Sequence, residues 1–143
     1  AEPGCSAARA RQRAETMLGR MALPDPHRVM GSYAFELSGG MRQRVGIAMA
    51  MTFSPALLLA DEPTSALDVT MQAEIVRQML ALRREEGTAI MIVTHNLGVA
   101  AHMADRIMVM RAGRVLELGP TERVIDHPTH EYTASLLASM PSL

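Results

Sequence analysis

The sequence predicts an α/β fold in which a mostly parallel sheet is flanked by helices. Two short apolar segments, residues 56–60 and 89–93, are typical of buried strands, and the amphipathic segment 70–86 between them has helical periodicity. Strands that alternate with helices in this way pair in parallel, because each helix returns the chain to the same edge of the sheet. Further helices and one hairpin are expected outside this strand–helix–strand unit.

The amino-terminal part is predicted to be helical. Residues 6–22 form the first expected helix, which has a serine at its cap position. The run Leu23–Pro26 ends this helix, since each proline disfavours helix at the residue before it. A polar connection is expected as far as Glu36. The next helix, largely buried, is expected after Ser38 and up to Phe53.

The central part contains the two predicted strands. The segment 56–60 is wholly apolar, which is typical of a strand buried on both faces. The helix over 70–86 is expected to end at Gly87, where a left-handed glycine commonly stops a helix. The second strand covers 89–93, and Asn96 is expected to cap a short helix after it.

The carboxyl-terminal part is predicted to hold a hairpin and two helices. Residues 106–110 and 114–118 flank Ala112–Gly113, a pair that suits a tight turn. Thr121 and Thr129 are each expected to open a short helix.

Composition excludes several classes of chemistry. The 143 residues include 14 basic and 15 acidic side chains, a balance that argues against a nucleic-acid partner. All the basic residues are arginines, so chemistry that needs a lysine, including a phosphate-binding P-loop lysine, is excluded within this sequence. One cysteine excludes an internal disulfide and a cysteine-based metal site. Because the sequence begins at Ala1, we expect it to be part of a longer protein.

A first candidate site lies at the start of the second helix. Ser38, Gly39 and Gly40 occupy this position. The first N–H groups of a helix lack partners within it and lie at the positive end of its dipole, so they bind anions such as phosphate. Glycines allow an oxygen ligand to approach the backbone, and the serine hydroxyl adds a donor. An ordinary serine cap with a glycine entry explains the same residues.

A second candidate site follows the first strand, where Asp61 and Glu62 lie side by side. In α/β sheets, ligands bind beyond the carboxyl ends of the parallel strands. One carboxylate there suits Mg²⁺. The other suits the orientation or deprotonation of a water molecule. His95 follows the second strand in the same way and is expected near the two carboxylates, although a lone histidine is more often structural.

Together these segments resemble the ATP-binding-cassette (ABC) ATPase family. Leu37–Gly40 matches that family's signature motif, and Leu57–Asp61 followed by Glu62 matches its Walker B strand and catalytic glutamate. Ser65–Asp68 matches the D-loop and His95 the switch histidine. The resemblance implies a partial P-loop NTPase (RecA-like) domain that lacks the N-terminal strands and the P-loop.

The resemblance narrows to the dipeptide, oligopeptide and nickel importer branch. Segments Met41–Val45 and Asp68–Thr70 look like that branch, as does the tail from His127 to Pro141. Two departures from the wider family stand out. Met41 replaces a more widespread glutamine, and Asn96 stands where an aspartate is more usual after the switch histidine.

The resemblance also implies a mechanism with ATP and Mg²⁺. Two nucleotide-binding subunits form a head-to-tail dimer, in which Ser38, Gly39 and Gly40 bind the γ-phosphate of ATP held by the partner. Asp61 helps to hold Mg²⁺, Glu62 and His95 are catalytic, and Asp68 lies at the dimer interface.

The implied subunit powers solute import from the cytoplasmic face of the inner membrane. It would be peripheral to that membrane, bound to transmembrane permease subunits and served indirectly by an external solute-binding protein. Three segments are expected: residues 1–53 ending in the signature helix, 54–119 forming the carboxyl-terminal half of the ATPase core, and a helical tail over 120–143.

Two alternatives remain open at this level. One is a non-transport ABC ATPase. The other is a truncated subunit that docks without catalysing hydrolysis. Because the phosphate-binding lysine is missing from residues 1–143, these residues are expected to be inactive by themselves.

Overall fold

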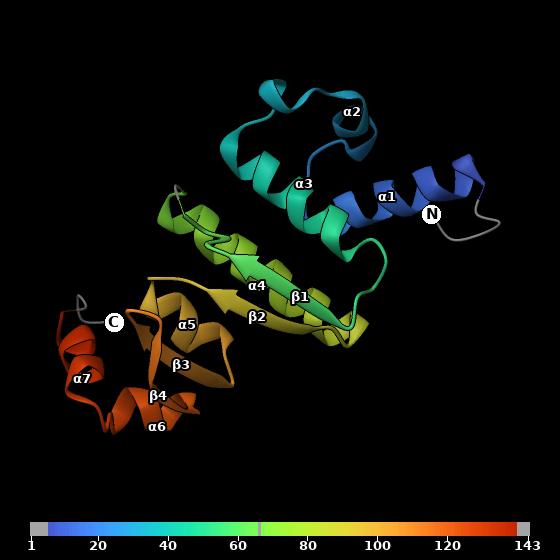
Figure 1. The fold of residues 1–143 in the computed structure, drawn as a ribbon. Coiled ribbons are helices and arrows are strands. Elements are labelled where there is room, and N and C mark those ends of the chain that lie inside the picture. Colours follow the sequence, from blue (N-terminus) through green and yellow to red (C-terminus); the bar gives the residue numbers. More distant parts are fainter. Residues whose placement is uncertain (1–5, 66, 140–143) are drawn as a thin grey trace. The chain divides into compact units, whose positions relative to one another are not determined.

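The computed structural model describes residues 6–65 and 67–139. Its contacts divide the chain into two compact units, the first ending at Ile92 and the second beginning at Val93 (Figure 1). Ala66 of the expected D-loop and Pro141 of the expected tail lie outside the described residues. In the described part of the chain, no helix combines the length and apolar character needed to cross a membrane.

The first unit begins with helices and continues into a strand–helix–strand arrangement. Its elements are α1 (Ala7–Arg20), α2 (Pro26–Gly31), the 3-10 helix η1 (Ala34–Glu36), α3 (Gly39–Met51), β1 (Leu57–Asp61), α4 (Val69–Glu86) and all but the last residue of β2 (Ala89–Val93). The expected polar connection up to Glu36 is therefore partly wrong, because α2 and η1 form within it. Pro26 at the first turn and an Asp25 cap explain α2, since proline fits a helix start.

Side-chain caps set the starts of the helices. Ser6 Oγ accepts the Arg9 N–H at 3.3 Å, and an Asp68 carboxylate oxygen accepts the Met71 N–H at 2.9 Å. At the other end of α4, Gly87 adopts φ +67°, the left-handed stop that the sequence predicts. These local signals explain why α1 and α4 begin and end within one or two residues of the predicted positions.

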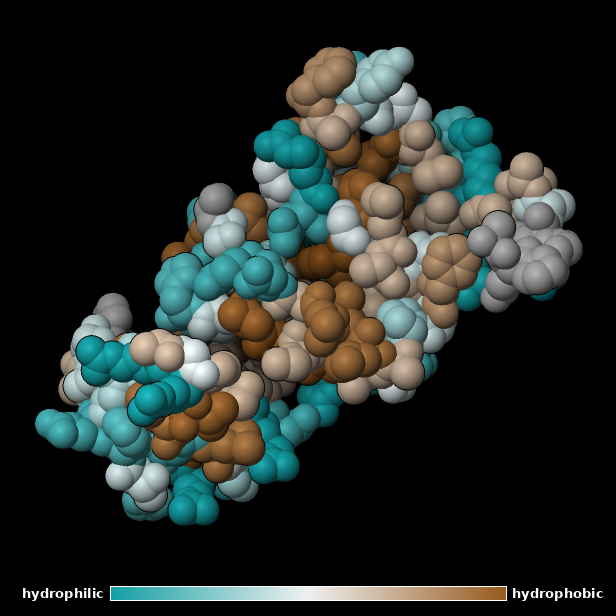
Figure 2. All heavy atoms as spheres, in the orientation of Figure 1, coloured by the Kyte–Doolittle hydropathy of each residue, from teal (hydrophilic) through white to brown (hydrophobic). Residues whose placement is uncertain are grey.

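The sheet of the first unit consists of β1 and β2, which run in the same direction (Figure 1). The Ala89 N–H donates to the Ala56 carbonyl at 3.0 Å where the two strands begin. Burial alternates along β1: Leu58 is buried, whereas Leu57 and Leu59 are 52 % and 67 % exposed. Figure 2 shows apolar residues gathered over β1. The expectation of a first strand buried on both faces is therefore wrong, because residues 6–65 and 67–139 leave Leu57 and Leu59 exposed.

The second unit contains a hairpin and three helices. Its elements are α5 (Leu97–Met103), β3 (Arg106–Arg111), β4 (Arg114–Pro120), α6 (Thr121–Asp126) and α7 (Glu131–Ala138). β3 and β4 are antiparallel, and Ala112 and Gly113 both adopt positive φ in the turn between them. That is the geometry of a type I′ hairpin turn.

The start of α7 differs from the expectation. His130, not Thr129, is its N-cap residue. Thr129 instead donates its backbone N–H and its hydroxyl to one carboxylate oxygen of Glu117, at 2.9 and 2.8 Å. The threonine therefore joins the helix start to β4, and sequence alone did not indicate this long-range partner.

Candidate functional site

The start of α3 presents the first candidate site. Ser38 Oγ accepts the Met41 N–H at 3.3 Å, so the serine hydroxyl keeps its own hydrogen to donate to a ligand. Ser38 and Gly39 are exposed, whereas Gly40 is buried. Ser38 thus caps the helix and is exposed, and binding of phosphate by its hydroxyl stays a prediction.

Gly40 lies where α3 approaches the start of α4. A Cβ atom at this position would lie 2.9 Å from the Met71 Cε atom and 3.8 Å from a Leu67 methyl group. The absence of a side chain therefore permits close packing of α3 against the segment that precedes and begins α4. This contact joins the signature motif to the expected D-loop within one unit.

Arg42 holds the backbone just before the helix. Its guanidinium donates to the Leu37 carbonyl at 2.5 Å and to the Ala34 carbonyl at 3.4 Å. Upstream, the Tyr33 N–H donates to a Glu36 carboxylate oxygen at 2.7 Å. These bonds fix the path of the chain into Ser38. Sequence reasoning did not assign Arg42 this role, because its carbonyl partners are set by the turn and not by residue type.

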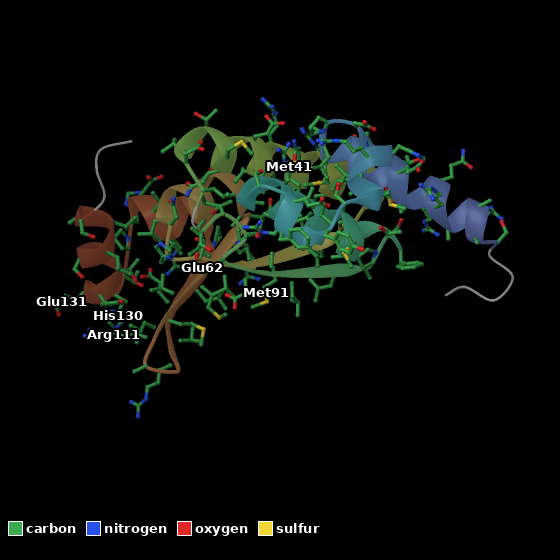
Figure 3. The ribbon with its side chains drawn as sticks, turned by 90° about the horizontal axis from the view of Figure 1, so that it is seen from above. Met41, Glu62, Met91, Arg111, His130 and Glu131 are labelled. Atoms are coloured by element: carbon green, nitrogen blue, oxygen red, sulfur yellow. The ribbon has the colours of Figure 1, made fainter. Side chains whose placement is uncertain are left out.

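The second candidate site is the carboxyl end of β1. Asp61 is the last residue of the strand and is exposed, and Glu62 follows it (Figure 3). Glu62 adopts φ +46°, in the left-handed region that disfavours residues with a side chain. Its carbonyl accepts the Ser65 N–H at 3.1 Å and the Ser65 hydroxyl at 2.9 Å. Glu62 therefore begins a tight turn that the N–H and the hydroxyl of Ser65 close.

A groove of about 220 Å³ joins α3 to the end of β1. Arg42, Gln43 and Ile47 of α3 line one side, and Leu59, Asp61 and Pro63 line the other. The middle of α3 and the aspartate of the second candidate site thus border one groove, whereas Ser38, Gly39 and Gly40 are not among its lining residues.

The expected D-loop leads from Glu62 into α4. Asp68 is exposed and caps this helix. Gln72 Nε2 donates to the Thr64 carbonyl at 3.1 Å and to the Leu67 carbonyl at 3.2 Å, so one side chain holds both sides of the loop.

The family model and the relatives found by comparison with known proteins agree with one another. A model described as ABC transporter matches residues 3–65. The oligopeptide transport ATP-binding protein OppD of Haemophilus influenzae is 51 % identical over 89 % of this chain and 39 % of its own length. The glutathione import ATP-binding protein GsiA of Salmonella typhi is 45 % identical over 98 % of this chain and 22 % of its own length.

Solved structures agree with these relatives. A dimeric ATP-binding cassette bound to ADP and Pi in a post-hydrolysis state matches with a TM-score of 0.74 and 32 % identity, over 85 % of this chain and 51 % of that one. Over nearly its whole length this chain is similar to members of the ABC transporter family. It spans 39 % of the length of OppD and 22 % of the length of GsiA, and so only part of the curated relatives named above. The α/β architecture and the family resemblance predicted from sequence are both confirmed.

His95, the expected switch histidine, lies in the second compact unit. His95 is exposed and precedes Asn96, whose side chain accepts the Val99 N–H at 3.1 Å and caps α5. The unusual asparagine thus performs the capping expected of it. A meeting of His95 with Asp61 and Glu62 stays a prediction.

The donor set fits Mg²⁺ bound together with phosphates. Among residues 6–65 and 67–139 there is no group of three or more His, Cys, Asp or Glu side chains arranged for a metal ion. Mg²⁺ in nucleotide sites needs one or two carboxylates and completes its shell with phosphate oxygens and water. The exposed Asp61 carboxylate is suited to that role.

Proposed function

We propose that this chain is part of an ATP-binding subunit that hydrolyses ATP to drive import of peptides or a similar solute. Support comes from two features of the first unit: an accessible helix start at Ser38, and the Asp61–Glu62 pair at the carboxyl end of β1. The relatives named above are ATP-binding proteins of oligopeptide transport and glutathione import, and their names support a peptide-like solute.

Ser38, Gly39 and Gly40 bind the γ-phosphate of ATP that a second nucleotide-binding subunit holds, in a head-to-tail dimer. The hydroxyl hydrogen that Ser38 retains and the N–H groups at the start of α3 supply the donors. ATP closes the dimer, because these donors reach phosphate only when both subunits meet. The dimeric cassette structures among the matches support this assembly.

Asp61 and Glu62 divide the chemistry between them. Asp61 supplies one carboxylate ligand to Mg²⁺, which neutralises phosphate charge when bound. Glu62 orients the attacking water and accepts its proton. His95 contacts the γ-phosphate, and Asp68 lies at the interface between the two subunits.

The remaining partners follow from the importer class. The subunit binds transmembrane permease subunits at the cytoplasmic face of the inner membrane, and an external solute-binding protein delivers the solute to them. In this account residues 1–53 carry the signature, residues 54–119 belong to the ATPase core and residues 120–143 form a helical tail.

Phosphate release by the full-length subunit tests the proposal. Glu62→Gln keeps the size of the side chain but removes its ability to accept a proton, so we expect ATP turnover to fall by roughly 10²–10⁴-fold, the usual scale for losing a general base. The control is Glu122→Gln, an exposed glutamate on α6, which should keep the wild-type rate. Near-wild-type turnover by Glu62→Gln would overturn the assignment.

A further inference from the structure

We propose that Gln72 is a positioning residue for Glu62, acting through the turn that connects β1 to α4. This inference rests on the proposed catalytic role of Glu62. Gln72 does not contact a reacting group in this account. Its side-chain amide fixes the backbone from which the glutamate extends.

The amide holds the turn at two points. Gln72 Nε2 donates one hydrogen to the Thr64 carbonyl at 3.1 Å and the other to the Leu67 carbonyl at 3.2 Å. Both donors of the amide group are thereby used on one loop. Gln72 itself is fixed, because its own N–H donates to the Asp68 carbonyl at 2.9 Å within the first turn of α4.

The turn needs such support at both of its ends. Thr64 is 1 % exposed, and a buried backbone carbonyl requires a hydrogen-bond partner. Glu62 adopts a left-handed backbone, which persists only where the surroundings impose it. Ser65 supplies part of this constraint by donating its N–H and its hydroxyl to the Glu62 carbonyl. Gln72 holds Thr64, the residue just before Ser65, and so restrains the same turn from the side of α4.

The chemistry of this position favours glutamine. A glutamate has the same length but lacks the two donors at neutral pH, and a methionine has a similar volume but no hydrogen-bonding group of comparable strength. Loss of the two bonds would let the turn relax and move the Glu62 carboxylate away from its water. Misplacement of a catalytic group by about 1 Å costs on the order of 10²-fold in rate.

The test uses Gln72→Met and Gln72→Glu in the full-length subunit. We expect kcat for ATP hydrolysis to fall by roughly 10–100-fold while KM for ATP changes less than about twofold. The matched control is Gln78→Met. Gln78 is a buried glutamine on the same helix that donates to Glu74 at 2.6 Å, away from the turn. Its replacement should leave kcat unchanged.

A double variant separates positioning from a general structural effect. If Gln72 acts through Glu62, Gln72→Met should cause no further loss of kcat when it is added to Glu62→Gln, because the group that it positions is already gone. A further loss of the same factor in the double variant would contradict the proposal. So would a wild-type kcat in both Gln72 variants, or failure of both to fold, which would assign Gln72 a structural role.

The same assays distinguish failure of the proposed catalytic role of Glu62 from failure of the positioning role of Gln72. High turnover by Glu62→Gln would reject the proposed function and with it this inference. Low turnover by Glu62→Gln combined with full turnover by both Gln72 variants would reject the positioning role alone.

Discussion

At the scale of single residues, Glu62 combines a backbone under strain with the proposed catalytic role. Its φ of +46° is disfavoured for any residue with a Cβ atom, yet the turn around it is closed by hydrogen bonds to its carbonyl. Strain of this kind is common at functional sites, where the position of a side chain outweighs the local cost. The geometry therefore predicts a conflict between stability and activity at this position.

Replacing Glu62 by glycine should expose that conflict. Glycine adopts the left-handed conformation without steric cost, whereas alanine keeps the Cβ atom, so we expect Glu62→Gly to be more stable than Glu62→Ala by about 1 kcal/mol. Both variants should lose ATP turnover. Thermal unfolding of the two full-length proteins measures the difference, and equal or greater stability of the alanine variant would show that the backbone is unstrained.

Glu117 makes the second unit sensitive to acid. The Thr129 N–H, the Thr129 hydroxyl and the His130 N–H donate to the Glu117 carboxylate and lower the pKa of this carboxyl from 4.5 to about 2. A carboxyl whose pKa is lower in the folded state stabilises the fold fully above its unfolded pKa, and this stabilisation is lost as the pH falls toward the folded value.

The expected consequence is a loss of stability between about pH 4.5 and pH 2 that depends on Glu117. Glu117→Gln should flatten the dependence of melting temperature on pH in that window and should also lower stability at neutral pH. Glu122→Gln, at an exposed site, serves as the control. An unchanged acid dependence in Glu117→Gln would contradict the role given to these hydrogen bonds.

At the scale of elements, local signals predict more than long-range ones. The caps at Ser6 and Asn96, the stop at Gly87 and the hairpin turn at Ala112–Gly113 follow from residue type and neighbouring sequence, and the structure contains each of them. In contrast, the exposure of one face of β1 depends on which elements cover the sheet, which an apolar run does not specify.

In the candidate site, too, local features could be predicted from the sequence and long-range contacts could not. Its residues and their order along the chain are visible in the sequence, because Ser38, Asp61 and Glu62 each follow or precede a recognisable element. The side chains that position these residues cannot be recognised in the sequence. Arg42 and Gln72 bind backbone carbonyls, and the positions of these carbonyls arise only from the folded turn. Every residue has a backbone carbonyl, so residue type does not predict which carbonyl will accept such a hydrogen bond.

The contact between α3 and α4 gives a prediction at this scale. Gly40→Val should clash with Met71 and Leu67, and overpacking of this kind costs about 1–3 kcal/mol. Met71→Ala should recover part of the loss when combined with it, because the methionine methyl is the closest obstacle. Additive effects in a double-mutant cycle, measured by chemical unfolding, would show that the two residues are not in contact.

At the scale of the whole molecule, the two compact units contain different parts of the proposed machinery. The first holds the signature, the Walker B end and Asp68, and the second begins just before His95. Within the first unit, Arg20 of α1 pairs with Glu85 at 2.6 Å and with Glu86, which also accepts the Ser54 hydroxyl at 2.7 Å. These contacts tie the first helix to the end of α4.

The exposed apolar residues of β1 also matter at this scale. Leu57 and Leu59 leave a face that promotes association when uncovered, so residues 1–143 by themselves are a poor subject for assays of oligomeric state. Experiments on assembly belong with the full-length subunit.

Size-exclusion chromatography of full-length Glu62→Gln with ATP and Mg²⁺ tests the central claim most directly. If Glu62 is the catalytic base and Ser38 binds the partner's nucleotide, blocked hydrolysis should trap the closed dimer, and adding Ser38→Arg should return it to monomer while ATP still binds. A Glu62→Gln protein that stays monomeric with bound ATP, or that forms the same dimer when Ser38 is replaced, would contradict the account.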